Sequence, residues 1–486
     1  MGQCWKSIPC KYCIKIYTTS KYDKKSSMKF FIIKLGFILI AATLLLYPVF
    51  TYAGNGIPPS IGKIRIEFIL FALTLIGVAV FHNKTFWVAI IGLSVILIFK
   101  FIFDSQFDFA EHFLGKVSLF DQIIDKDLRQ GEWPVLLNLF GLLLGFAILA
   151  KHFEGTGIPA LLPKYLPHDW KGPFVLLVFI FILSSFLDNI AAALIGGTIA
   201  LVVFDKKVHI GYLAAIVAAS NAGGAGSVLG DTTTTMMWIG GVSLLNVLHA
   251  YVAAGAAFLI FAWFASQQQH KYHHILKHAK KDVKLNLKKL LIIILMLVGA
   301  IMTNFLYDLP ALGVWIAIGI GAVFEDTPWK ESKNAMTGTI FLLCLVSCAS
   351  LMPVNDLPPA SWMSTFILGF VSAVFDNIPL TKLCLEQGCY DWGMLAYAVG
   401  FGGSMIWFGS SAGVALCNEF PDARNVVLWI KKGWHIILAY IVGFFLLYMI
   451  MGWEPADNKK VKIKDCPCID CPVKPAVNSN PTLQPK

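Results

Sequence analysis

Two apolar stretches of the chain carry the same polar signature. Each contains a serine and, four residues later, an Asp-Asn pair: Ser184, Asp188 and Asn189 in the first stretch, and Ser372, Asp376 and Asn377 in the second. An ionised aspartate at the centre of a bilayer costs about 2.5–3.5 kcal/mol on insertion scales, so such residues usually face a cavity and bind something. The duplicated acids are therefore candidates for a binding site.

A glycine-rich break follows each signature. The first break contains Asn221, Gly223-Gly224 and Gly230-Asp231-Thr232, and the second contains Gly402-Gly403-Ser404 and Gly409-Ser410. In both copies, the glycine that ends the break, Gly230 or Gly409, stands six positions after the second glycine of the pair. Duplicated, glycine-interrupted breaks in apolar segments are the best sequence pointer to a transporter's binding site.

Oxygen atoms dominate the donors in these segments. The carboxylates of Asp188, Asp231 and Asp376 have hydroxyl or amide neighbours, and the glycine pairs free backbone carbonyls from helical bonds. Such ligands suit a hard cation such as sodium and suit an anion poorly. A carboxylate that binds a proton or sodium, but not both, is sufficient for antiport. The alternative is that Asp188 and Asp376 only cap the helices that follow them.

Two other charged residues are weaker candidates. Glu154 ends an apolar run and is interpreted either as a gate carboxylate or as an ordinary helix end. Lys382 precedes Glu386 by four residues, so an ion pair is the simplest interpretation, and a counter-ion in the pocket is the alternative. We find no nucleophile motif, phosphate loop or metal-site spacing in the sequence, and we expect neither an enzyme nor a cofactor beyond the transported ions.

Composition places the chain in a membrane. Of its 486 residues, 57% are hydrophobic and only 14% are charged, which excludes an ordinary soluble domain. The formal charge of +10 comes from loops and tails, where basic residues set orientation, so nucleic acid is not an expected partner. We expect an all-α polytopic protein whose partners are membrane lipid and small cations.

The apolar runs indicate how the signatures are positioned. Runs 173–204 and 361–388 carry the Asp-Asn pairs near their middle, which predicts two re-entrant hairpins. Runs 210–240 and 394–418 carry the glycine breaks, which predicts two unwound transmembrane helices. Each repeat would therefore pair one hairpin with one broken helix.

Loop charges predict the orientation. If residue 54 lies outside, the loop 104–134, with seven acids and three bases, also lies outside, and the loop 265–289, with seven lysines, lies inside. The two repeats are then inverted, which is the architecture of alternating access. The four lysines between residues 459 and 464 fall on the external side and disagree with this assignment.

The predicted organisation has seven segments. They are an N-terminal extension (1–53), helices with the acidic loop (54–134), repeat 1 (135–264), a basic cytoplasmic loop (265–289), linking helices (290–336), repeat 2 (337–450) and a Cys/Pro/Lys tail (451–486). Residues 28–53 read as a cleaved signal peptide or as an uncleaved first helix. We interpret five cysteines as packing residues: Cys344, Cys348, Cys384, Cys389 and Cys417. The tail cysteines are only a weak metal signal.

The ordered motifs resemble those of NhaD-type sodium/proton antiporters, which are related to dicarboxylate/sodium symporters and arsenite permeases. The resemblance covers roughly residues 60–450 and rests on the segments 219–224, 230–234, 375–380, 402–404 and 409–413. It implies hairpin tips that meet two unwound helices at the midplane with sodium bound there, a homodimer and an elevator-like motion. It also implies a bacterial inner-membrane location.

The chain departs from the family pattern at two places. Alanines occupy positions 191–193, where the antiporters usually have threonines, and Lys382 stands where an apolar residue is expected. These changes leave the transported ion open. The alternatives to sodium (or lithium)/proton antiport are a sodium-coupled carrier of dicarboxylate or citrate, an arsenite-type permease and an ion sensor without transport.

Overall fold

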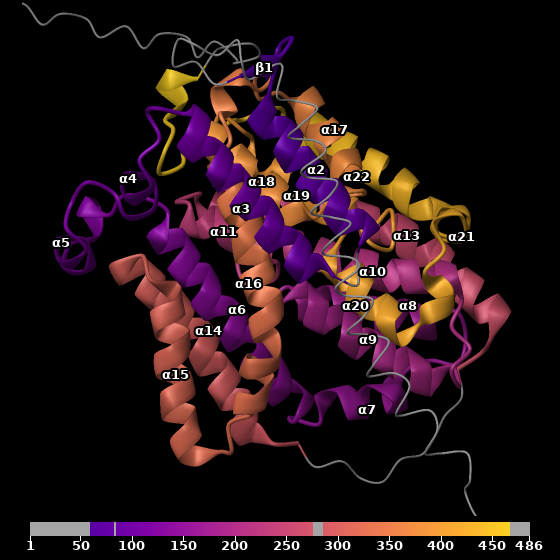
Figure 1. Ribbon diagram of the computed structural model, residues 1–486. Coiled ribbons are helices and arrows are strands. Elements are labelled where there is room, and N and C mark those ends of the chain that lie inside the picture. Colours follow the sequence, from indigo (N-terminus) through magenta and orange to yellow (C-terminus); the bar gives the residue numbers. More distant parts are fainter. Residues whose placement is uncertain (1–58, 82–83, 276–284, 467–486) are drawn as a thin grey trace, which may run out of the picture. The chain divides into compact units, whose positions relative to one another are not determined.

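The computed structural model describes residues 59–81, 84–275 and 285–466 (Figure 1). Six helices in this part of the chain are long and apolar enough to cross a membrane: Thr85–Phe103, Trp133–Glu154, Leu244–Tyr272, Leu287–Tyr307, Trp329–Ser350 and Trp434–Met451. The protein is therefore an all-α polytopic membrane protein, as its composition predicts. The predicted signal peptide lies outside the described residues.

The chain divides into two compact units. One comprises residues 1–66 and 99–106, and its described part holds the antiparallel strands β1 (Ser60–Ile61) and β2 (Ile64–Arg65). The other comprises residues 67–98 and 107–486. Two helices cross the boundary between the units, α2 (Ile66–Val80) and α3 (Thr85–Phe103). All the residues discussed below belong to the second unit.

Short helices form the acidic loop that precedes repeat 1. They are α4 (Phe109–Leu114), α5 (Leu119–Ile124) and η1 (Lys126–Leu128). Asp108 and Ser118 start α4 and α5 by accepting a hydrogen bond from the backbone N–H three residues later. Two helices follow, α6 (Trp133–Glu154) and α7 (Ile158–Tyr165).

Repeat 1 contains two interrupted helices. The first is split into α8 (Lys171–Ser184) and α9 (Asn189–Val203), and the second into α10 (Ile210–Ala225) and α11 (Thr232–Ile239). The short α12 (Leu244–Leu248) and the long α13 (Ala250–Tyr272) complete it. Because α13 continues to Tyr272, the first residues of the segment predicted as the basic loop are helical.

Repeat 2 has the same pattern of breaks. After α16 (Trp329–Ser350) and η2 (Val354–Asp356), one helix is split into α17 (Trp362–Ser372) and α18 (Asn377–Gln387). The next is split into α19 (Trp392–Gly402) and α20 (Ser411–Glu419). The remaining elements are η3 (Pro421–Ala423), α21 (Val426–Lys432), α22 (Trp434–Met451) and η4 (Ile463–Asp465).

The linking segment is a helical hairpin of α14 (Leu287–Tyr307) and α15 (Pro310–Phe324). The two helices pack along their length (Figure 1), and Gly299 and Gly313 let their backbones approach closely. Asp308 ends α14 in the left-handed conformation, with φ 53°, and the chain then reverses into α15.

The centre of the second unit is built from α10 and α19. Every residue of α19 is buried, as is every residue of α10 after the first. The two helices pack against each other, α8 covers α10, and α17 covers α19. The broken helices of both repeats therefore meet in the most enclosed part of the protein.

Four of the five cysteines predicted to be packing residues are free thiols, and the fifth forms a disulfide. Cys344, Cys348, Cys384 and Cys417 are buried free thiols, as expected of packing residues. The same prediction for Cys389 is wrong, because its sulfur forms a disulfide with Cys466, 77 residues further along the chain. The partner lies in the tail, and nothing in the local sequence around Cys389 distinguishes it from a packing cysteine.

Candidate ion-binding site

Asp188 and Asp376 occupy matching positions in the two repeats. Each is the residue before a helix, and each accepts a hydrogen bond from the backbone N–H two residues later. The bond from Ile190 to Asp188 is 3.2 Å long, and the bond from Ile378 to Asp376 is 3.0 Å. Both residues therefore cap the helices that follow them. Capping uses one carboxylate oxygen, so the other is available for a second partner.

The second partner is a hydroxyl at the start of a broken helix. Thr232 at the start of α11 donates to Asp188 at 3.3 Å, and Ser411 at the start of α20 donates to Asp376 at 3.1 Å. Both aspartates are only partly buried. Ser411 is absent from the predicted site, although its equivalence to Thr232 is visible in the sequence: each is the second residue after the glycine that ends the break.

Asp231 and Ser410 are equivalent caps of α11 and α20, but they differ in charge. Asp231 accepts one bond from the Thr233 N–H at 3.0 Å, and Ser410 accepts one from the Gly413 N–H at 3.3 Å. The Oδ2 atom of Asp231 is buried and has no hydrogen-bond partner among the described residues. An unpaired buried carboxylate oxygen is costly unless something binds it, so this atom marks a candidate ligand position.

An amide-hydroxyl network joins the two repeats. Asn189 donates to Asn221 at 3.0 Å, and Asn221 donates to Ser404 at 2.9 Å and to Ser410 at 3.2 Å. All four side chains are at least 95% buried. Asn221 in α10 thus connects α9 to the break of repeat 2.

The network is not repeated in the second half. By its offset from the glycine pair, the counterpart of Asn221 is Gly400. Accordingly, the amide nitrogen of Asn377, the counterpart of Asn189, has no hydrogen-bond partner in the part of the chain that the structure describes. A Cβ atom at Gly400 would lie 3.4 Å from Asp231 Oδ2, so the missing side chain leaves space beside the unpaired oxygen.

Ser184 bonds α8 to α10, and Ser372 bonds α17 to α19. The Ser184 hydroxyl donates to the Ser220 carbonyl and the Ser372 hydroxyl to the Val399 carbonyl, both at 2.6 Å. The acceptors stand at the same offset from the glycine pairs. In this conformation both hydroxyl protons are used for packing, and only lone pairs remain for an ion.

A cavity of about 230 Å³ reaches the site from one side. Asp376 and Ser411 line it together with Asn418 at the end of α20, Ile190 in α9 and Thr85 at the start of α3. Its other lining residues are mainly apolar. Asp376 is therefore reachable from a cavity on the side where α20 ends and α3 begins.

The weaker candidates lie elsewhere. Glu154 is exposed at the end of α6 and pairs with Lys151 at 2.6 Å, so it is an ordinary helix-end residue in this structure. Lys382 makes the expected ion pair with Glu386 at 2.5 Å, and it also bonds to Glu132. Lys382 lines a different cavity from the one that contains Asp376.

The donors gathered at the breaks are oxygen and amide groups, which are the kinds of ligand that a hard cation takes. Carboxylates, hydroxyls and amides converge on the breaks, and the site contacts given above include no basic side chain. No group of three or more His, Cys, Asp or Glu residues gathers for metal binding within the described ranges. Each of the three aspartates caps a different helix: Asp188 caps α9, Asp231 caps α11 and Asp376 caps α18.

Comparisons with known proteins bear on the family of the chain. A family model described as "Citrate transporter" matches residues 167–402, which run from α8 to the end of α19. The chain is 24% identical over 323 residues to the Na(+)/H(+) antiporter NhaD of Vibrio cholerae, covering 55% of this chain and 67% of the relative. It is 27% identical over 318 residues to NhaD of Alkalimonas amylolytica, covering 54% and 66%. The chain is therefore similar to NhaD-type antiporters over about half of its length.

A plant relative extends the comparison. Sodium/proton antiporter 1 of Arabidopsis thaliana is 29% identical over 283 residues, which is 48% of each chain. The matches thus span about two thirds of the two bacterial relatives and about half of the plant one. The resemblance inferred from the motifs is confirmed, and the protein is a transmembrane transporter.

Proposed function

We propose that this chain exchanges cytoplasmic sodium or lithium for external protons by alternating access. Asp188, Asp231 and Asp376 are the exchange carboxylates in this proposal. Their neighbours supply oxygen ligands: Ser184, Asn189, Asn221, Thr232, Ser372, Asn377, Ser404, Ser410 and Ser411. Bacterial and plant relatives are named as sodium/proton antiporters, which supports this assignment.

One observation carries the proposal. Each repeat contributes a carboxylate bonded to a hydroxyl at the start of a broken helix, Asp188 to Thr232 and Asp376 to Ser411. A third carboxylate, Asp231, caps α11 beside Thr232, and one of its buried oxygens has no hydrogen-bond partner among the described residues. A cation can bind these oxygens when they are ionised, and a proton can replace it, so the two ions compete for one site.

The charge distribution supports an orientation with the tail outside. The tail lysines that opposed this orientation have acidic partners: Lys459 pairs with Asp308 at 3.2 Å and Lys462 with Asp457 at 3.7 Å. Acidic residues count little in the positive-inside rule, so the support for this orientation comes from the loop charges and not from these pairs. The Cys389–Cys466 disulfide also suits an oxidising compartment outside the bacterial inner membrane.

The test uses everted membrane vesicles that report internal pH with a dye. Adding sodium or lithium chloride should collapse the proton gradient of vesicles containing the wild-type protein, and potassium chloride should have less effect. Asp376→Asn should abolish the response, because an amide cannot exchange a proton for a cation. Asp422→Asn, which neutralises an exposed acid in η3, is the matched control and should behave like wild type.

Two results would reject the assignment. Persistence of the sodium response in both Asp376→Asn and Asp188→Asn vesicles would show that these carboxylates are not the exchange groups. No response to any cation, in vesicles shown to contain the protein, would favour a carrier of another solute. The alanines at 191–193 would then be the first place to look, since Ala192 and Ala193 are fully buried in the first turn of α9, where the family has hydroxyls.

The second candidate function is sodium-coupled uptake of an organic anion. The family model bears the description "Citrate transporter", which is the observation that favours it. Against it, Lys382 is bonded to two carboxylates and lines a separate cavity, so it does not offer a positive charge at the site. Uptake of labelled citrate or succinate driven by a sodium gradient would establish this alternative.

The re-entrant path of the hairpins, the inverted arrangement and the homodimer belong to the same proposal. Light scattering of the detergent-solubilised protein should give the mass of two chains. A single-chain mass would remove the homodimer from the proposal without affecting the transported ions.

A further inference from the structure

The segment after α22 crosses the ends of two site helices. Residues 452–466, here called the strap, bond to the last turns of α11 and α18. The Lys459 N–H donates to the carbonyl of Gly240, which ends α11, at 2.9 Å. The Asn458 side chain donates to the Leu385 carbonyl in α18 at 2.9 Å. The Cys389–Cys466 disulfide fixes the far end of the strap just beyond α18.

A buried charge cluster lies beneath the strap. Its four members are Glu132 before α6, Lys382 and Glu386 in α18, and Lys460 in the strap. Lys382 lies 2.5 Å from a carboxylate oxygen of Glu132 and 2.5 Å from one of Glu386. Lys460 bonds to the same two carboxylates, at 2.7 Å in the case of Glu386. Two positive and two negative groups therefore balance.

Lys460 has the most exposed side chain of the four members of the cluster. Its side chain is 42% exposed, whereas those of Glu132 and Lys382 are 2% exposed. Burial alone would raise the pKa of Glu132, but Lys382 and Lys460 lower that pKa to about 2. Glu132 therefore stays ionised, and departure of Lys460 leaves two buried carboxylates with a single ammonium. Removing one partner from a buried ion pair is strongly unfavourable.

The strap lies at the opposite ends of the helices that begin in the site. Asp231 starts α11 and Asp376 starts α18, and these two helices pack against each other. With 11 residues, α18 is about 16 Å long at 1.5 Å per residue. A displacement of the strap is therefore transmitted to the site along two short helices, α11 and α18.

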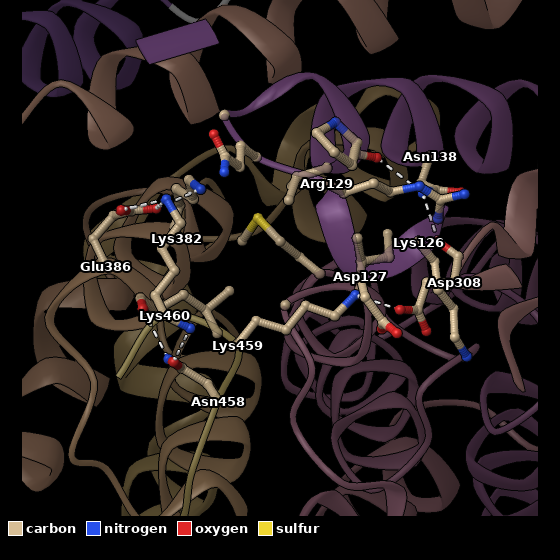
Figure 2. Close-up of a pocket in the computed structure, with 18 residues that line it drawn as sticks. Lys126, Asp127, Arg129, Asn138, Asp308, Lys382, Glu386, Asn458, Lys459 and Lys460 are labelled. Atoms are coloured by element: carbon tan, nitrogen blue, oxygen red, sulfur yellow. Dashed lines mark hydrogen bonds and ion pairs between the residues drawn. The ribbon is translucent and has the colours of Figure 1, made fainter. Parts of the chain in front are cut away.

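The strap and Asp376 adjoin two different cavities. A cavity of about 500 Å³ adjoins the strap and is lined by Lys382, Glu386 and Lys460, together with Met236 and Ile239 of α11 (Figure 2). Asp376 does not line this cavity; it lines the smaller cavity beside Thr85 and Asn418. In the orientation proposed above, the strap faces outside, and α20 and the start of α3 lie toward the cytoplasm.

We propose that the strap is the external gate of the ion path and that Lys460 is its positioning residue. Lys460 holds the end of α18 against the start of α6, and the neighbouring Lys459 N–H holds the end of α11. The bonds of Lys460 must break before the site opens to the outside. This inference rests on the proposed function for its transport readout. It adds a regulatory element outside the ion-binding oxygens.

The first experiment measures the KM for sodium from each side of the membrane. Lys460→Ala destabilises the closed gate and should shift the protein toward the outward-open state. We expect the KM for cytoplasmic sodium, measured in everted vesicles, to rise about fivefold, the lower end of typical coupling between sites. The KM for external sodium, measured in right-side-out vesicles, should fall. The maximal rate should change less than either KM.

Two variants separate gating from general damage. Lys462→Ala removes another strap lysine, which pairs only with Asp457 in an exposed position, and should leave both KM values unchanged. Lys460→Arg keeps the positive charge and should restore the wild-type values. Equal KM values for Lys460→Ala and Lys462→Ala on both sides would overturn the proposal, as would a parallel rise of KM on both sides.

A second experiment does not depend on the transported ion. A cysteine introduced at Ser411 reports access to the site through its reaction with a membrane-impermeant thiol reagent added outside. Its labelling should be faster when combined with Lys460→Ala than with Lys462→Ala, with the chain lacking Ser411→Cys as background. Equal labelling rates overturn the gate even if sodium/proton exchange is absent, so the two proposals fail independently.

Discussion

At the scale of single residues, the site depends on which side chain is missing as well as on which are present. Asp231 has a buried oxygen without a hydrogen-bond partner among the described residues, and Gly400 in the facing helix α19 leaves space beside it. The equivalent position in repeat 1 is Asn221, which fills its space with an amide. The two repeats therefore share a framework but contribute different groups to the site.

Gly400→Ala tests whether the space beside Asp231 holds the cation. The new Cβ would lie 3.4 Å from Asp231 Oδ2 and 3.7 Å from the Ala225 side chain, which are ordinary contacts, so the variant should fold. Because a methyl group would occupy the coordination space, we expect the KM for sodium to rise about tenfold, equivalent to about 1.4 kcal/mol. The measurement is the sodium dependence of dye recovery in everted vesicles.

Gly255→Ala is the control for the effect of adding a methyl group to a helical glycine. Gly255 lies within α13 and has no atom within 4 Å of the position of an added Cβ, so this variant should transport normally. An unchanged KM in Gly400→Ala would mean that the cation does not occupy the space beside Asp231.

At the scale of elements, the breaks are held by backbone contacts that repeat in both halves. A Cβ on Gly223 would lie 2.0 Å from the Phe181 carbonyl oxygen, and a Cβ on Gly402 would lie 2.3 Å from the Gly369 carbonyl oxygen. These distances are far below van der Waals contact. The glycines are required because α8 crosses α10, and α17 crosses α19, with the backbones in direct contact.

Gly402→Ala should therefore disrupt packing where Gly400→Ala does not, although the two positions are in one helix. The clash is with backbone atoms, which cannot rotate away, and overpacking of this kind costs about 1–3 kcal/mol or more. We expect a clear drop in the melting temperature of the detergent-solubilised protein and loss of transport.

Gly319→Ala in α15 is the matched control for this prediction. Its added Cβ meets no atom within 4 Å, so the melting temperature should not fall. Wild-type stability of Gly402→Ala would show that α17 and α19 are further apart than the structure places them.

At the scale of the whole molecule, the chain closes on itself through its C-terminal strap. The disulfide between Cys389 and Cys466 encloses the second broken helix of repeat 2 and all of α22. In the chain-entropy account, such a crosslink stabilises mainly by restricting the unfolded chain, typically by about 2–4 kcal/mol. The disulfide thus anchors the strap to the transport repeat.

Removing the disulfide should lower stability without removing the ion site. We expect Cys466→Ser to reduce the melting temperature of the oxidised protein while sodium-dependent proton movement persists. Cys389→Ser should have the same effect, and the double variant should be no less stable than either single variant, because all three lack one bond. Clearly additive effects would show that the two sulfurs act separately.

Much of the site could be predicted because its signals are local. Asp188 and Asp376 stand at helix starts with a preferred capping residue, and the glycine pairs interrupt helices wherever the fold places them. Because the pattern occurs twice, the two breaks can be recognised in the sequence as the same structural feature. Ser411 could have been found by the same duplication, by transferring the position of Thr232 to the second copy.

Other features were decided only by tertiary structure. The bonds from Asn221 to Ser404 and Ser410, the space at Gly400 beside Asp231, and the position of Lys460 between Glu132 and Glu386 join residues far apart in the chain. Local propensity carries no information about such partners, because they are set by how the helices pack. The sequence by itself determined where the helices break and which oxygens the breaks expose. The packing of the helices decided which of these oxygens meet and which one has no hydrogen-bond partner among the described residues. It also decided which lysine bonds to Glu386 near the end of α18.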